Sequence, residues 1–140
     1  MDITERIKQE RGKDTIAGIL PGALSASVAD VARSFGLLDS PECYEEIDVV
    51  EAAGVIENVL HWDMAYKTEI MSISLARELS GEFLAAFAGA DARFFTNGEW
   101  GRSTGALGVG WTPVTSATFD TGVLVVSDQM AGCVWCMDED

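Results

Sequence analysis

Val123-Leu124-Val125-Val126 is the segment that decides the fold, because a short apolar run rich in β-branched residues is typical of a buried strand. Asp128 to Gly132 follow it with residues that favour a turn. Cys133 to Met137 then form a second apolar run. The pattern predicts a strand, a turn and a returning strand near the end of the chain.

Further strand and loop signals precede this pair. Arg93 to Thr96 resemble a short strand, and the Asn97-Gly98 dipeptide after it favours a hairpin turn. Residues 98–110 contain five glycines and are expected to form a mobile loop. Trp100 and Trp111 bracket that loop, where tryptophans serve either as interface anchors or as plugs of the core.

Helical patterns dominate the chain before residue 90. Ser27 and Asp30 have the spacing of a capping box, and Ser40-Pro41 resembles another helix start that would turn Val50 inward. Helices are therefore expected over residues 2–11, 27–36, 40–54 and 68–88, whereas residues 55–67 fit either a helix or a strand. The expected architecture is one α+β domain over residues 1–140. Its helical N-terminal two-thirds pack on a small antiparallel sheet formed by the C-terminal third.

Net charge is the unusual property of this sequence. The chain has 23 acidic and 9 basic residues, for a formal net charge of −14. This charge disfavours direct binding to nucleic acid or to an anionic membrane. There is no signal-like N-terminus and no apolar run of membrane-spanning length, and the chain has three cysteines, an odd number. We therefore expect a cytoplasmic protein.

The negative charge is confined to one part of the chain. Residues 1–33 have five acids and five bases, so the whole net charge of −14 lies in residues 34–140. The densest acidic stretch consists of Glu42, Glu45, Glu46, Asp48 and Glu51, and the chain ends with Asp138, Glu139 and Asp140. Such asymmetry marks either an interaction surface or a solvated face that maintains solubility.

Candidate chemical groups are few. Cys133 and Cys136 form a C-x-x-C pair, but within a strand they point to opposite faces and cannot chelate one metal ion. The glycine-rich loop lacks the lysine of a phosphate-binding loop. His61 precedes Trp62-Asp63 and is either a general base or a half-buried structural histidine. Asp120 and Glu99 are one of many carboxylate pairs that can in principle perform acid–base chemistry. No cofactor and no metal are expected.

These observations favour a non-enzymatic, acidic binding protein. Its partner would be a basic protein, such as a toxin or a nuclease-type effector, whose active or nucleic-acid-binding surface it masks and inhibits. In size and charge alone, the chain resembles the immunity proteins of bacterial toxin systems. The expected contacts are the acidic stretch, the acidic tail, and Trp100 and Trp111 as apolar anchors.

Two alternatives remain open at this stage. The first is a phage-encoded anti-defence protein, anti-CRISPR or anti-restriction, whose carboxylates imitate the phosphates of nucleic acid. The second is a small enzyme that uses His61 or a carboxylate pair. The sequence does not fix the oligomeric state.

Overall fold

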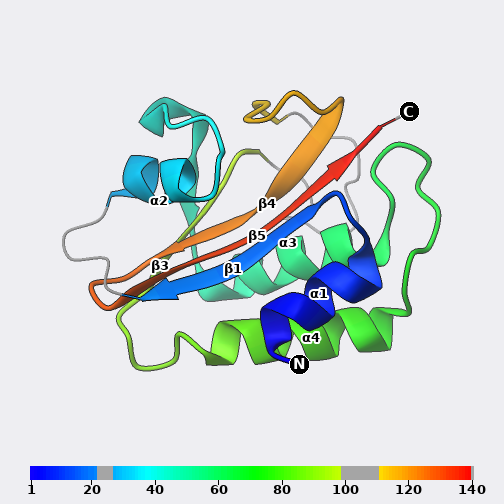
Figure 1. The fold of residues 1–140 in the computed structure, drawn as a ribbon, viewed down its shortest axis with the longest axis horizontal. Coiled ribbons are helices and arrows are strands. Elements are labelled where there is room, and N and C mark those ends of the chain that lie inside the picture. The colour runs from blue at the N-terminus through cyan, green and yellow to red at the C-terminus, as the bar shows by residue number, and fades with distance from the viewer. Residues whose placement is uncertain (22–26, 99–110, 140) are drawn as a thin grey trace.

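A five-stranded antiparallel sheet organises the protein, as a computed structural model describing residues 1–21, 27–98 and 111–139 shows (Figure 1). The strand order is β1-β5-β4-β3-β2. The strands are β1 (Thr15–Pro21), β2 (Glu45–Ile47), β3 (Arg93–Thr96), β4 (Phe119–Val126) and β5 (Met130–Asp138). The helices are α1 (Ile3–Arg11), α2 (Val28–Ser34), the 3-10 helix η1 (Pro41–Cys43), α3 (Val49–His61) and α4 (Ile73–Ala85).

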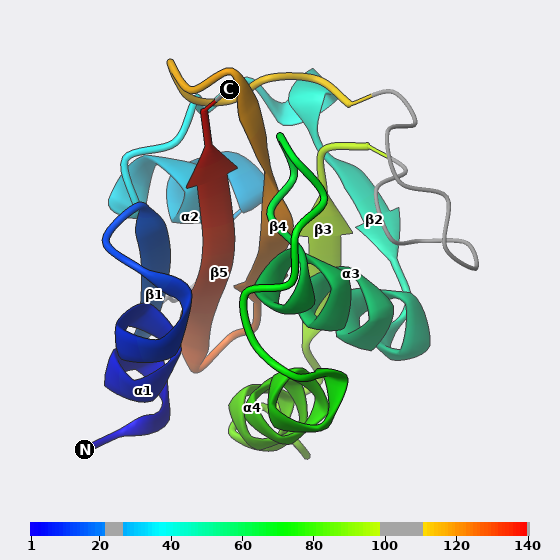
Figure 2. The same ribbon diagram turned by 90° about the vertical axis from the view of Figure 1, so that its right-hand side faces the viewer.

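Helices cover both faces of this sheet. Helices α1, α3 and α4 lie on one face, and α2 lies on the other (Figures 1 and 2). Val123 and Val125 of β4 join the hydrophobic core on the side of α3 and α4, whereas Leu124 joins the core on the side of α2. The β4 run is therefore continuously apolar because each of its faces is buried.

The α+β class and the antiparallel sheet from the C-terminal third are confirmed. Strands β3, β4 and β5 come from that third, and β5 returns against β4 as expected. Two further strands, β1 and β2, were not expected, because they come from the part of the chain that was expected to be helical. They form the two opposite edges of the sheet.

The bounds predicted for the helix over residues 40–54 are wrong. Ser40 precedes only the single turn of η1, and the chain then forms β2. Helix α3 begins after Asp48 and continues through Gly54 to His61. Asp48 and Glu51 form a capping box, which fixes the start of the helix there. The ambiguous residues 55–67 are therefore helical up to His61.

The other helix ends follow local rules. The Ser27–Asp30 capping box is present, and Gly36 follows α2 with a φ of 77°, a conformation that glycine adopts without strain. Helix α4 is shorter than expected, since it begins after the N-cap Ser72. Gly89, with a φ of 79°, lies beyond its end. Within the described residues, no helix has the length and apolar character needed to cross a membrane.

The hairpin turn expected at Asn97-Gly98 is also wrong. Gly98 forms an antiparallel bridge with Trp111, so the dipeptide does not close a two-residue turn. The Asn97 side chain is buried and donates to the carbonyl oxygens of Thr112 and Asp120. Most of the expected glycine-rich loop, residues 99–110, lies outside the described residues.

Candidate protein-binding surface

The acidic stretch runs along the β2 edge of the sheet and into the start of α3. The fold places its members in three consecutive elements, with Glu42 in η1, Glu45 and Glu46 in β2, and Asp48 and Glu51 around the first turn of α3. All except the half-buried Glu51 are exposed. We define the β2–α3 surface as Glu42, Glu45, Glu46, Asp48, Val49, Val50 and Glu51.

Two of these acids stabilise the beginning of α3. The Asp48 carboxylate accepts the backbone N–H of Glu51 at 2.8 Å, and the Glu51 carboxylate accepts the N–H of Asp48 at 3.4 Å. Negative charge is favoured at a helix N-terminus, where the first N–H groups lack helical partners. The positions of both charges are therefore set by the helix itself.

Glu46 differs from its neighbours because an arginine neutralises it. Arg93 donates two hydrogen bonds to the Glu46 carboxylate, at 2.8 and 3.1 Å. These bonds hold the pKa of Glu46 below its ordinary value and raise the pKa of Arg93. The guanidinium also lies 5.3 Å from the centre of the Phe95 ring. Glu46 therefore adds less net charge to the surface than the sequence predicts.

Two apolar side chains lie between the acids of this surface. Val49 is 49% exposed and Val50 is 77% exposed, and Asp48 and Glu51 flank them in the sequence. The prediction that Val50 points inward is wrong, because the helix begins later than expected and Ala52 and Val55 form its buried face. An apolar centre with a polar rim is the usual arrangement of a protein interface. The sequence feature that could have revealed this centre is the Asp48–Glu51 capping box, because it fixes the start of α3 and therefore the exposure of Val49 and Val50.

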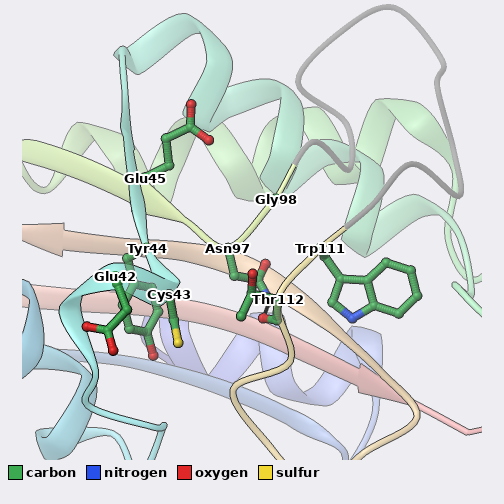
Figure 3. Close-up of a pocket in the computed structure, with 8 residues that line it drawn as sticks. All are labelled: Glu42, Cys43, Tyr44, Glu45, Asn97, Gly98, Trp111 and Thr112. Atoms are coloured by element: carbon green, nitrogen blue, oxygen red, sulfur yellow. Dashed lines mark hydrogen bonds between the residues drawn. The ribbon is translucent and has the colours of Figure 1, made fainter.

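The structure describes one of the two tryptophans that are expected as apolar anchors. Trp100 lies outside the described residues. Trp111 is half-buried, and its ring packs 5.5 Å from the ring of Phe119. It borders a pocket of about 530 Å³, in which Asn97 and Thr112 lie between Trp111 and Glu42 (Figure 3). Trp111 thus lines the same pocket as Glu42 and Glu45 of the β2–α3 surface.

A buried carboxylate organises the segment beside this pocket. Asp120 is 1% exposed and accepts the backbone N–H groups of Val114 and Thr115, each at 3.2 Å. Its other oxygen accepts from the Asn97 amide at 3.0 Å and from the Trp135 indole at 3.1 Å. These donors satisfy a buried acceptor, which gives Asp120 a structural role. Glu99, its proposed partner, lies outside the described residues.

Only part of the acidic tail is exposed to solvent. Asp138 belongs to β5, is 8% exposed, and pairs with Arg11 at 2.7 Å. This burial corrects the expectation that Asp138 contacts a partner, because its carboxylate is already enclosed. Glu139 is exposed and accepts the backbone N–H of Thr118 at 3.2 Å. Asp140 lies outside the described residues.

The remaining candidate groups have structural partners. His61 is 8% exposed, and its Nδ1 lies 2.7 Å from the carbonyl oxygen of Met71. Cys133 and Cys136 are buried in the cores on opposite faces of the sheet, as the strand pattern predicted. Burial raises the pKa of Cys136 to about 11 and that of Cys133 well above its ordinary value. Among the residues described, no cluster of three or more His, Cys, Asp or Glu side chains has the arrangement of a metal site.

Comparisons with known proteins add no relative. No protein-family model matches the chain, and neither a curated protein nor a solved structure is significantly similar to it. The functional argument therefore rests on the geometry and charge of the chain.

Proposed function

We propose that this chain is a non-enzymatic binding protein that inhibits a basic protein partner by covering the partner's active or nucleic-acid-binding surface. The observation that carries the proposal is the β2–α3 surface, where acids border the exposed side chains of Val49 and Val50. A protein that neutralises a bacterial toxin in the cytoplasm is the form of this function that we favour. The neutralised toxin would be a nuclease or another effector with a cationic cleft.

Electrostatics and apolar contact have separate roles in this proposal. Opposite fields on two proteins raise the rate of association, and this effect weakens as salt screens the charges. Burial of apolar side chains at the centre of an interface mainly slows dissociation. The acids would therefore guide the partner to the surface, and Val50 would help to retain it.

The first experiment identifies the partner. The tagged protein is used to capture partners from its native cell or host lysate at low salt, and the captured proteins are identified by mass spectrometry. We expect a stoichiometric basic protein that is released as salt rises and whose purified activity this chain inhibits. Recovery of a defence-complex subunit would instead favour the anti-defence alternative. Recovery of the chain alone would contradict the proposal.

The second experiment tests the surface. We expect Glu42→Lys with Glu45→Lys to slow association with the captured partner on the order of tenfold at low salt. The matched control is Glu10→Lys with Asp128→Lys, which makes the same change in net charge at two exposed positions elsewhere. Equal rates for the two variants would show that the β2–α3 surface is only a solvated face.

A further inference from the structure

Strand β1 forms the edge of the sheet opposite β2, and the two edges differ in chemistry. Strand β2 has three residues, of which Glu45 and Glu46 are charged. Strand β1 has seven residues, Thr15 to Pro21, and none is charged. Exposed edges are normally protected from pairing by short length or by charged side chains. Edge β2 has both protections, whereas the longer β1 ends in a proline but has no charge.

The backbone of β1 is oriented for a further strand. The N–H of Met137 donates to the carbonyl of Asp14 at 3.0 Å, in continuation of the β1–β5 register. Hydrogen-bonded pairs alternate along an antiparallel ladder, so every second residue turns its N–H and C=O away from β5. Those residues are Thr15, Ala17 and Ile19. Within residues 1–21, 27–98 and 111–139, no backbone group of another element bonds to this side of β1.

Partly exposed apolar side chains also lie on the faces of β1 beside this edge. Leu20 is 39% exposed, and Ile16 and Ile19 are half-buried. β1 lies along the front of the molecule in Figure 1 and at the left margin of the sheet in Figure 2, with α1 and α2 on opposite faces beside it. An added strand at this edge would extend the sheet between these two helices.

The charge distribution favours a second copy of this chain at the β1 edge. Residues 1–33 contain five acids and five bases, whereas residues 34–140 contain the entire net charge of −14. Two copies therefore repel each other least where they meet through the segment that contains β1. We infer that β1 pairs antiparallel with β1 of a second copy across a two-fold axis, which joins the two sheets into one and leaves both β2–α3 surfaces exposed.

Sedimentation velocity of the full chain over a wide concentration range tests the association. A dimer is expected, and added salt should strengthen it because salt screens the repulsion between two acidic copies. Binding of a basic partner has the opposite salt dependence, so failure of one proposal is distinguishable from failure of the other. A single copy at all concentrations, at both low and high salt, contradicts the inference.

Hydrogen exchange on the unmodified chain locates the interface. The amides of Ala17 and Ile19 should become protected as concentration rises, whereas those of Gly18 and Leu20, which bond to β5, should be protected throughout. The variant Ala17→Pro removes an outward N–H, a change that edge strands tolerate, and should leave a folded monomer. A dimer whose Ala17 and Ile19 amides exchange freely would place the interface elsewhere. Protection that appears only with another protein would make that protein the occupant of the edge.

Discussion

Arg11 and Asp138 form an ion pair of 2.7 Å in which both side chains are buried, with exposed fractions of 4% and 8%. The pair connects the end of α1 with the end of β5. Arg11 Nε also donates to the carbonyl of Val59 at 2.6 Å, and Asp138 accepts the N–H of Met64 at 2.8 Å. A residue expected to meet a partner thus holds one helix, the last strand and the end of α3 together.

Loss of one partner of this pair should destabilise the fold. We expect Asp138→Asn to lower the free energy of unfolding by about 3–5 kcal/mol, because the Arg11 charge would remain buried without its counter-charge. Urea denaturation followed by circular dichroism measures the change. Glu139→Gln, at an exposed neighbour, is the control and should cost less than about 0.5 kcal/mol. Equal effects of the two substitutions would contradict the role assigned to the pair.

Asp120 should stabilise the segment that follows Trp111. Asp120→Asn replaces a carboxylate oxygen with an NH₂ group at a site where the backbone N–H groups of Val114 and Thr115 donate, and should cost about 1–3 kcal/mol. Because the Trp135 indole donates to the same carboxylate, the near-ultraviolet circular dichroism signal should change as well. Asp128→Asn, at an exposed position in the β4–β5 turn, should leave both quantities unchanged. An unchanged Trp135 environment in Asp120→Asn would argue against the network.

The sequence predicted those elements whose causes are local. The Ser27–Asp30 capping box is one example, and the apolar run Val123 to Val126 is another. It did not predict β2, because Ser40-Pro41 resembles a helix start and Glu45–Ile47 becomes a strand only by pairing with residues 94–96 of β3. Pairing between distant segments depends on tertiary structure, which a single sequence does not display.

The sequence predicted the acidic residues of the candidate surface but not its exposed apolar residues. The five acids of the stretch do lie together, because they are close in sequence and occupy consecutive elements. The exposure of Val50 depends on where α3 begins, which the misplaced helix start concealed. Burial of Asp138 was not predictable either, because its partner Arg11 is at the other end of the chain.

The three cysteines should differ in reactivity. Only Cys43 is partly exposed, whereas burial raises the pKa values of Cys133 and Cys136, so their thiols stay protonated at mildly alkaline pH. We expect a thiol reagent to label one site per folded chain and three after denaturation, and Cys43→Ser to abolish labelling of the folded protein. Rapid labelling of folded Cys43→Ser would contradict the structural role of the C-x-x-C pair. Changing Cys133 and Cys136 to serine should lower stability without loss of a bound metal.

The Glu46–Arg93 pair should respond to pH in a defined direction. Arg93 holds the pKa of Glu46 below its ordinary value, so the interaction is fully present above that ordinary value and is lost as pH falls through the lowered one. Arg93→Met should therefore raise the Glu46 pKa toward its ordinary value, as measured by NMR titration of the carboxyl carbon. Arg77→Met removes a different pair, with Glu57, and should leave the Glu46 titration unchanged. If both variants titrate like the unmodified protein, the Arg93 contact does not persist in solution.

Val50 should act on the lifetime of the complex rather than on its formation. Its side chain is 77% exposed, so Val50→Ala should leave the free energy of unfolding within about 0.5 kcal/mol of its original value. If Val50 packs at the centre of the interface, the same change should speed dissociation of the basic partner, on the order of tenfold for a loss of about 1.4 kcal/mol. The association rate should remain unchanged, because no charge is altered.

Leu38→Ala, at another exposed apolar residue (47% exposed), is the control and should alter neither rate. Surface plasmon resonance with the purified partner measures both rates, and a normal dissociation rate for Val50→Ala would remove Val50 from the proposed contact.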